Sequence, residues 1–226
     1  MVSGSLIVIG ASAGGVEALR CVVAGLPARL DAAVCVVLHM PADSSSNLPT
    51  ILGRAGPLTA EHATDGQIVR SGCIFVAPPD RHLTVADGRL HVVRGPRENG
   101  HRPAIDPLFR SAAREGGARV IGVVLSGSLD DGATGLQAVK EAGGIAVAQD
   151  PEDALFAGMP MSAIELVAVD HVLPAEELGP LIAGLVGARS GKEGPSVPSE
   201  MPHANAEEQQ HGQTRFDGLV QRRSQC

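Results

Sequence analysis

The chain has 226 residues, 44% of them hydrophobic, and a formal net charge of −7 at pH 7. It has no Trp or Tyr and only four Phe, so aliphatic side chains must build the core, and this composition favours an α/β layer fold. The negative charge and the scarcity of aromatic rings argue against nucleic acid as a partner, because phosphates attract basic patches and single strands need rings for base stacking.

Four short apolar runs, rich in Val and Ile, are typical of buried parallel strands. They are Leu6–Gly10, Ala33–His39, Val120–Leu125 and Ile145–Ala148. Helical patterns follow three of these runs, at Gly15–Ala24, Asn47–Arg54 and Thr134–Ala142. The alternation of strand, turn and helix predicts a doubly wound α/β fold, with a mostly parallel sheet and helices on both faces.

The middle of the chain follows a different pattern. Two runs of alternating apolar and polar residues flank Asp87-Gly88, a dipeptide typical of tight hairpin turns, so we expect an antiparallel hairpin excursion or a sheet edge there. A further helix should begin near Asp106, where the segment DPLFRSAAREGG offers an acidic cap, a proline in the first turn and glycine at the end.

From about residue 190 the chain becomes polar and rich in Gly, Pro, Ser and Gln. Such a segment has too little apolar surface to form a core. We therefore expect one folded domain over residues 1–189 and a disordered tail over residues 190–226. The last part of that tail, residues 216–223, mixes apolar and basic side chains and could instead be a docking peptide.

The cysteines show neither C-x-x-C spacing nor the density of a disulfide scaffold, which indicates reduced thiols. They are Cys21, Cys35, Cys73 and Cys226. No apolar run approaches the roughly 20 residues that span a bilayer, and the N-terminus lacks the basic region of a signal peptide. We expect a soluble cytoplasmic protein with no membrane insertion.

The segment GASAGG, Gly10 to Gly15, nearly satisfies both the dinucleotide fingerprint G-x-G-x-x-G and the nucleophile pattern G-x-S-x-G. In the fingerprint the second glycine lets the backbone approach a pyrophosphate, and Ser12 stands in its place here. The fingerprint also requires an acidic residue at the end of the second strand, where this chain has His39. We therefore favour a nucleophile and expect no nucleotide, other cofactor or metal.

Ser12, His39 and an Asp130-Asp131 pair each follow a predicted parallel strand. Residues just past the carboxyl ends of such strands converge on one crevice. Ser12 could attack a carbonyl carbon, His39 could carry its proton and an aspartate could orient the imidazole. Backbone N–H groups at the first helix and in the loop over residues 126–129 could bind the oxyanion.

Taken singly, each of these residues has a simpler explanation. Ser12 could cap a helix, His39 could be a partly buried surface residue, and Asp131 could be a turn residue. Because all three residues follow strand ends, a joint catalytic role has the same weight as these structural roles.

Five ordered motifs, which run through most of residues 6–186, resemble the CheB-type chemotaxis protein-glutamate methylesterases. They are IGASAGG at 9–15, LHMP at 38–41, HRPAIDPLF at 101–109, LSGSLDDGATG at 125–135 and AQDPEDALFAGMP at 148–160. The resemblance implies a Ser-His-Asp hydrolase that demethylates glutamate methyl esters on chemoreceptors, releases methanol and in many members also deamidates receptor glutamines. It implies Ser12 as nucleophile, His39 as base and Asp131, rather than Asp130, as the orienting acid.

The resemblance also implies backbone oxyanion donors, for which Ser128 and Ala13 are the candidates. Ser128 stands where a methionine is frequent in the family, and Ala13 stands where a hydroxyl residue is common. Asp130 lies where the family usually has a small residue, so two carboxylates are adjacent. If both are buried, their repulsion should raise the pKa of one of them.

Three further residues are candidates for substrate binding. His101 and Arg102 could border the cleft, where a cation would suit a carboxylate product. Equally, Arg102 could brace a loop while Asp106 caps a helix. Met159, in the tripeptide Gly-Met-Pro at 158–160, could contact substrate, although loop architecture at the rim of the cleft is the more favoured interpretation.

Well-known family members carry an N-terminal receiver domain that blocks the active site until it is phosphorylated. This chain begins with the predicted catalytic sheet, so we expect no phosphorylation control in cis and consider a regulatory signalling protein in trans. The expected substrate is a methylated chemoreceptor. The alternative function is a non-catalytic adaptor, in which the altered loop over residues 128–131 no longer supports hydrolysis.

Overall fold

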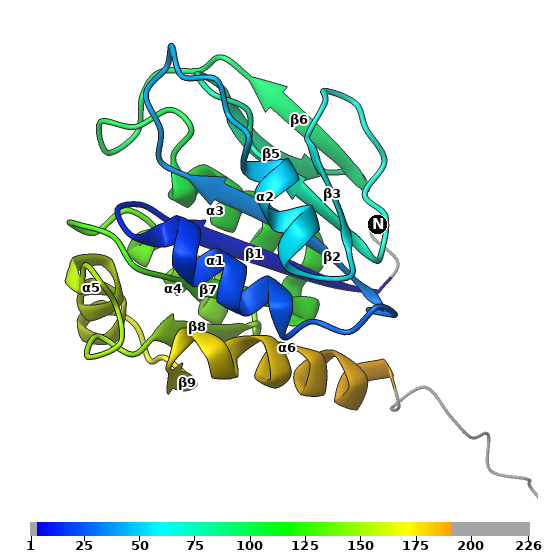
Figure 1. Cartoon of the computed structure of the whole chain (residues 1–226), viewed down its shortest axis with the longest axis vertical. Helices are drawn as coiled ribbons and strands as arrows, with labels where there is room; N and C mark the ends of the chain where they lie inside the picture. The colour runs from blue at the N-terminus through cyan, green and yellow to red at the C-terminus, as the bar shows by residue number, and fades with distance from the viewer. Residues whose placement is uncertain (1–3, 191–226) are drawn as a thin grey trace, which may run out of the picture. The chain divides into compact units, whose positions relative to one another are not determined.

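The four predicted strands lie side by side at the centre of a seven-stranded sheet in the computed structural model, which describes residues 4–190 (Figure 1). Every strand pairing in this sheet is parallel. In spatial order the strands are β3 (Thr59–His62), β4 (Cys73–Val76), β2 (Ala32–Leu38), β1 (Ser5–Ala11), β7 (Val120–Val124), β8 (Ile145–Gln149) and β9 (His171–Leu173). The predicted doubly wound parallel sheet is therefore confirmed.

The central strands β1 and β2 are buried along their whole length, because each is a continuous run of apolar or small residues. Side chains alternate between two hydrophobic clusters: Leu6 and Val8 enter one, and Ile7 and Ile9 enter the other. The two strands are in register to their last residues, with Ala11 opposite Leu38. The residues that follow them consequently emerge at the same edge of the sheet.

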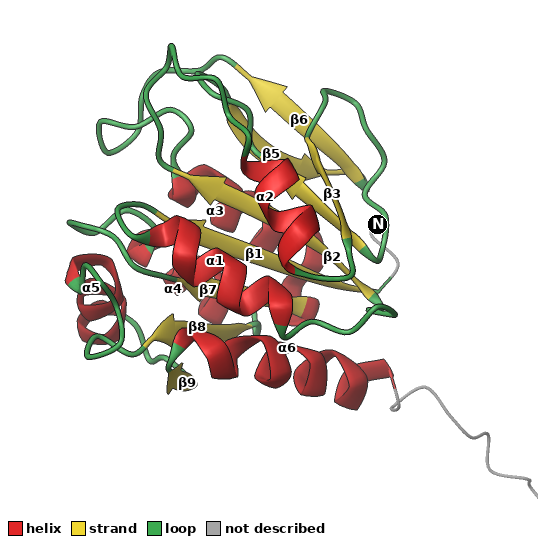
Figure 2. Cartoon of the chain, in the orientation of Figure 1, coloured by secondary structure: helices red, strands yellow, loops and turns green. Residues whose placement is uncertain are grey.

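Helices cover both faces of the sheet, as predicted. Figure 2 shows one layer in front of the sheet and another behind it. The front layer, which packs on the cluster containing Ile7, consists of α1 (Gly15–Ala24), α2 (Leu48–Ala55) and α6 (Ala175–Ser190). The other cluster takes side chains from α3 (Ile105–Gly116), α4 (Ala133–Glu141) and α5 (Gly158–Leu166). A short 3-10 helix, Gly117–Arg119, connects α3 to β7.

The predicted hairpin is also present, as a separate two-stranded antiparallel sheet made of β5 (His82–Ala86) and β6 (Arg89–Val93). Asp87 and Gly88 both have positive φ, 52° and 69°, which is the backbone conformation of a two-residue hairpin turn. The hairpin is attached to α3, because Ser111 Oγ accepts a hydrogen bond from the Val85 N–H at 3.0 Å.

Several elements have no counterpart among the predicted ones: β3, β4, β9, α5 and α6. The edge strands β3 and β9 are short and expose or half-expose their side chains, so they lack the continuous apolar run of a central strand. Helix α6 contains Pro180, a residue that usually ends a helix. The tripeptide Gly158 to Pro160 forms the first turn of α5, so its interpretation as a loop was wrong.

The predicted tail over residues 190–226, with the docking peptide at 216–223, lies outside the described residues except for Ser190, the last residue of α6. None of the helices within residues 4–190 is long and apolar enough to cross a membrane.

Candidate active site

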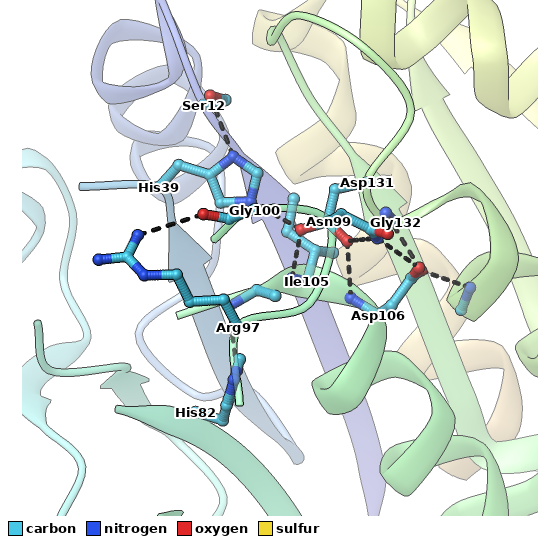
Figure 3. A network of polar contacts seen from close by, with 12 residues as sticks. Ser12, His39, His82, Arg97, Asn99, Gly100, Ile105, Asp106, Asp131 and Gly132 are labelled. Atoms are coloured by element: carbon cyan, nitrogen blue, oxygen red, sulfur yellow. Dashed lines mark hydrogen bonds and ion pairs between the residues drawn. The ribbon is translucent and has the colours of Figure 1, made fainter. Parts of the chain in front are cut away.

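Ser12, His39 and Asp131 meet at the carboxyl edge of the sheet, where they follow the neighbouring strands β1, β2 and β7 (Figure 3). The Ser12 hydroxyl lies 3.2 Å from His39 Nδ1. On the other side of the ring, His39 Nε2 lies 2.7 Å from Asp131 Oδ2. The sequence-predicted residues therefore form a continuous relay from hydroxyl to imidazole to carboxylate.

The state of the Asp131 carboxylate decides which ring nitrogen of His39 carries hydrogen. Burial alone would raise the pKa of Asp131, but hydrogen bonds from His39, the Ile105 N–H and Asn99 together hold its pKa below the usual value. The ionised carboxylate can only accept, so Nε2 of His39 donates to it. The Nδ1 lone pair consequently faces Ser12, which is the arrangement of a general base.

The turn after β1 leaves the half-buried Ser12 side chain out of the helix cap. The Ser12 N–H donates to the Ser126 carbonyl at 2.9 Å, which ties the end of β1 to the loop after β7. Gly14, with φ of 71°, occupies the N-cap position of α1, and no side chain caps this helix. The Ser12 hydroxyl is therefore free of local capping and available to His39.

Asp131 caps α3, the helix on which Asp106 lies, and Asp106 caps α4, the helix that begins two residues after Asp131. The Asp131 carboxylate accepts the N–H groups of Ile105 at 2.8 Å and Asp106 at 3.2 Å, the first residues of α3. The Asp106 carboxylate accepts the N–H groups of Gly132 at 3.1 Å and Gly135 at 2.7 Å, at the start of α4. Asp106 thus caps α4 and not its own helix, which corrects the predicted acidic cap.

Repulsion between Asp130 and Asp131 was expected only if both were buried, and Asp130 is exposed. The buried carboxylate beside Asp131 is Asp106, which is 4% exposed. Burial raises the pKa of Asp106, the Gly135 N–H opposes this rise, and the charge of Asp131 adds to it. The like-charge pair therefore exists, but its second member comes from α3.

Two backbone donors, one next to Ser12 in sequence and one in the loop after β7, have no acceptor within residues 4–190. Within residues 4–190, neither the Ala13 N–H nor the Ser128 N–H has a hydrogen-bond acceptor. By contrast, the Gly127 N–H donates to the Phe156 carbonyl at 2.9 Å. Ala13 and Ser128 thus keep the donors that sequence reasoning assigned to an oxyanion.

A family model described as CheB methylesterase matches residues 7–182. The chain belongs to this family. A solved catalytic domain of the family, the CheB methylesterase from Thermotoga maritima, is 35% identical and superposes with a TM-score of 0.78, over 82% of this chain and 100% of that domain. The family resemblance and the fold inferred from sequence are thereby confirmed.

Curated relatives carry matching names. A putative protein-glutamate methylesterase/protein-glutamine glutaminase from Leptospira interrogans is 39% identical over 180 residues, which cover 79% of this chain and 93% of that protein. Proteins named protein-glutamate methylesterase/protein-glutamine glutaminase 2 from Anaeromyxobacter dehalogenans and Pseudomonas aeruginosa are 40% and 41% identical, over 76% of this chain. The chain spans about half the length of these last two, 51% and 50%. The names support the enzyme interpretation and not the non-catalytic adaptor.

Of the predicted substrate-binding residues in this CheB-family site, His101 lies at the triad and Arg102 does not reach it. The His101 ring stacks on the His39 ring, with centroids 3.6 Å apart and planes 8° apart. Arg102 Nε donates to Asp80 at 2.8 Å, and its Nη1 donates to the Gly95 carbonyl at 2.7 Å. The loop-bracing alternative therefore describes Arg102.

Met159 is buried, with 1% of its surface exposed, so it does not line the cleft. Its N–H donates to the Gly127 carbonyl at 2.8 Å. A Cβ atom added to Gly127 would overlap Met159 Sδ and would lie 2.8 Å from Ser12 Cβ. Met159 thus packs against Gly127, in the loop that also contacts Ser12.

Sequence reasoning missed Asn99, whose amide donates to Asp131 Oδ1 at 2.8 Å and to Asp106 Oδ2 at 2.9 Å. Asn99-Gly100 is a dipeptide typical of tight turns, so the turn itself was readable from the sequence. Its side-chain partners were not, because Asp131 lies 32 residues further along the chain.

A small, mostly apolar pocket of about 240 Å³ opens between α1, α2 and the segment that follows β2. Leu38 and Met40, the two neighbours of His39 in sequence, contribute to its wall, together with Val16 from α1 and Leu48 and Ile51 from α2. Neither Ser12 nor His39 is among the residues that line this pocket, so it is separate from the triad.

Proposed function

We propose that the protein is a protein-glutamate methylesterase, which hydrolyses glutamate methyl esters on chemoreceptor-type proteins and releases methanol. The observation that carries this proposal is the relay from Ser12 Oγ through His39 to Asp131 Oδ2, with distances of 3.2 and 2.7 Å. Such a relay activates a hydroxyl for attack on an ester carbonyl. The names of the curated relatives support the choice of glutamate esters.

In the acylation step, Ser12 Oγ attacks the ester carbonyl carbon while its proton moves to His39 Nδ1. The imidazolium that forms is stabilised by Asp131, which accepts from Nε2 throughout. The carbonyl oxygen becomes an oxyanion, and the N–H groups of Ala13 and Ser128 are proposed to bind it. When the intermediate collapses, His39 returns the proton to the leaving methoxide, and methanol departs.

In the deacylation step, a water molecule takes the position of methanol, gives a proton to His39 and attacks the acyl carbon. The bond from this carbon to Ser12 Oγ then breaks, and His39 returns the proton to Oγ, which yields free glutamate and the Ser12 hydroxyl. An amide substrate would follow the same path with ammonia as leaving group. Deamidation of receptor glutamines is therefore a proposed second activity of the same site, supported by the double name of the relatives.

We further propose that the protein works in the cytoplasm, which the free thiols of Cys21, Cys35 and Cys73 support. Regulation by a signalling protein in trans stays a prediction.

The direct test is to incubate the protein with a radiolabelled methylated receptor and to measure volatile methanol. The wild type should release methanol and Ser12→Ala should not, because the hydroxyl is the nucleophile. Asp131→Asn should lower kcat by a factor on the order of 10³ to 10⁴, since an amide no longer holds the required tautomer. Asp130→Asn, a change to the adjacent exposed carboxylate, is the matched control and should leave kcat near wild type.

Equal release by the wild type and Ser12→Ala would contradict the proposed function. A serine-reactive fluorophosphonate probe separates two kinds of failure. If the probe labels Ser12 but no methanol appears, the hydrolase is intact and the substrate is wrong. If neither occurs, the protein is not a serine hydrolase and the adaptor alternative returns.

A further inference from the structure

Residues 98–101 form a tight turn in the loop between β6 and α3. Asn99 of this turn contacts Asp131 (Figure 3), and His101 contacts His39. The N–H and carbonyl groups of Glu98 and His101 are hydrogen-bonded to each other at 3.1 and 2.8 Å. Asn99 and Gly100 have φ of 50° and 79°, as expected for an Asn-Gly hairpin turn. The turn therefore has a defined geometry of its own.

Asn99 fixes the orientation of the Asp131 carboxylate. Its amide nitrogen donates to Asp131 Oδ1 at 2.8 Å, while the other oxygen, Oδ2, accepts from His39. The second hydrogen of the same amide goes to Asp106 at 2.9 Å. Both donors are used, so Asn99 bridges two buried carboxylates and has no N–H left for a substrate.

His101 supports His39 from the face of its ring. The two rings are stacked 3.6 Å apart, and the edges of the His39 ring remain directed at Ser12 and Asp131. Burial lowers the pKa of His101, the charge of a protonated His39 and that of Arg97 act in the same direction, and the Asp131 carboxylate opposes them. The stacked partner is therefore an uncharged flat ring at neutral pH.

The turn is held in place from three directions. Arg110, on α3, donates to the Glu98 carboxylate at 2.6 Å, and Arg97 donates to the Gly100 carbonyl at 3.2 Å. The buried ring of His82, on β5, bonds to the Pro96 carbonyl at 2.7 Å. The turn is thus connected both to the hairpin and to the helix whose first N–H groups Asp131 accepts.

We propose that the turn over residues 98–101 is a positioning element of the catalytic site, in which Asn99 fixes Asp131 and His101 fixes His39. This inference rests on the proposed function only for the identity of the ester. Asn99 and His101 are positioning residues, since they act through the relay. A misplacement of about 1 Å in such a relay costs on the order of 100-fold in rate.

Two substitutions of His101 test the stacking contact. His101→Ala removes the ring and should lower kcat on the order of 10- to 100-fold with little change in KM, because the relay and not substrate binding is disturbed. His101→Phe keeps a flat ring without polar atoms and should recover most of the lost kcat. His91→Ala, on the nearby strand β6, is the matched control and should behave as wild type.

Asn99→Gly tests the amide alone, because glycine adopts the left-handed backbone of this position without strain. We expect a lower kcat, an unchanged KM and an unchanged far-UV spectrum. A wild-type kcat in Asn99→Gly would overturn the role of Asn99. A raised KM in His101→Ala, or His101→Phe as slow as His101→Ala, would overturn the role of His101 and indicate polar contact with substrate.

The rate at which a fluorophosphonate probe labels Ser12 is measured in the same variants. This rate reports activation of the serine and needs no receptor. We expect the probe to label wild type and His101→Phe fast, and His101→Ala and Asn99→Gly slowly. This order of labelling rates supports the positioning role even if methanol release fails. Equal labelling rates in all four proteins would contradict it, whatever the natural ester is.

Discussion

Asp131 links catalysis to folding in one side chain. It accepts hydrogen bonds from the His39 ring, from two N–H groups at the start of α3 and from the Asn99 amide. A helix cap contributes about 1 kcal/mol in favourable cases, so any change at this residue affects stability as well as activity. Assays of Asp131 variants must therefore include a measurement of folding.

The lowered pKa of Asp131 makes its contribution to stability depend on pH. Its folded-state pKa lies below the ordinary value of about 3.9, so the ionised carboxylate stabilises the fold above that value, and the stabilisation is lost as pH falls through the folded-state pKa. The free energy of unfolding of Asp131→Asn should be lower than that of wild type at pH 7. The difference should shrink as the pH falls below about 4.

Urea unfolding of both proteins at neutral and acid pH measures this difference. Asp130→Asn serves as the control, because its exposed carboxylate should contribute little at either pH. A gap between wild type and Asp131→Asn that is the same at both values of pH would contradict the assignment.

The loop after β7 is packed so tightly at Gly127 that no side chain fits there. Gly127 lies between Met159 and Ser12, and the backbone around it is bonded to residues that precede or begin α5, Phe156 and Met159. The catalytic turn after β1 is joined to the same loop through Ser126. The position of Ser12 therefore depends on an element more than 100 residues further along the chain.

Gly127→Ala should destabilise the protein by about 1 to 3 kcal/mol and lower kcat, because the new methyl group must push Met159 or Ser12 aside. Gly184→Ala is the matched control. Gly184 is exposed within α6 and has nothing within 4 Å of a Cβ atom, so alanine there should stabilise the protein by up to about 1 kcal/mol with kcat unchanged. Thermal unfolding and methanol release measure both, and a fully active Gly127→Ala would refute the tight packing.

On the scale of the whole molecule, the sheet has a protected centre and accessible edges. Strands β1 and β2 are completely buried beneath helices on both faces, whereas β3 and β9 expose or half-expose every residue. The triad is attached to the protected centre, since its members follow β1, β2 and β7. A rigid support of this kind maintains the geometry that the relay requires.

Amide hydrogen exchange should follow this arrangement. We expect the amides of β1, β2 and β7 to exchange slowest, through global unfolding, and those of β3 and β9 to exchange faster through local opening. Exchange measured by mass spectrometry on overlapping peptides, corrected for intrinsic rates, gives the comparison. Protection of β3 equal to that of β1 would show that the edge is more stable than its burial suggests.

Much of the fold and the core of the site could be predicted from the sequence because local patterns carry them. The continuous apolar runs predicted β1, β2, β7 and β8 to within one or two residues, and the Asp87-Gly88 turn predicted the hairpin. Parallel strands end at one edge, so Ser12, His39 and an aspartate could be brought together without coordinates. Short, half-exposed strands such as β3 have no such pattern and were missed.

The sequence by itself therefore determined the parallel α/β sheet, the strand-end origin of the triad and the family. Only the tertiary structure decided that Asp106 is the second buried carboxylate, that Met159 packs against the active-site loop, and that Asn99 and His101 contact the triad. The physical reason is the range of the interactions. Strands and turns depend on neighbouring residues, whereas burial and side-chain contacts depend on segments that only folding brings together.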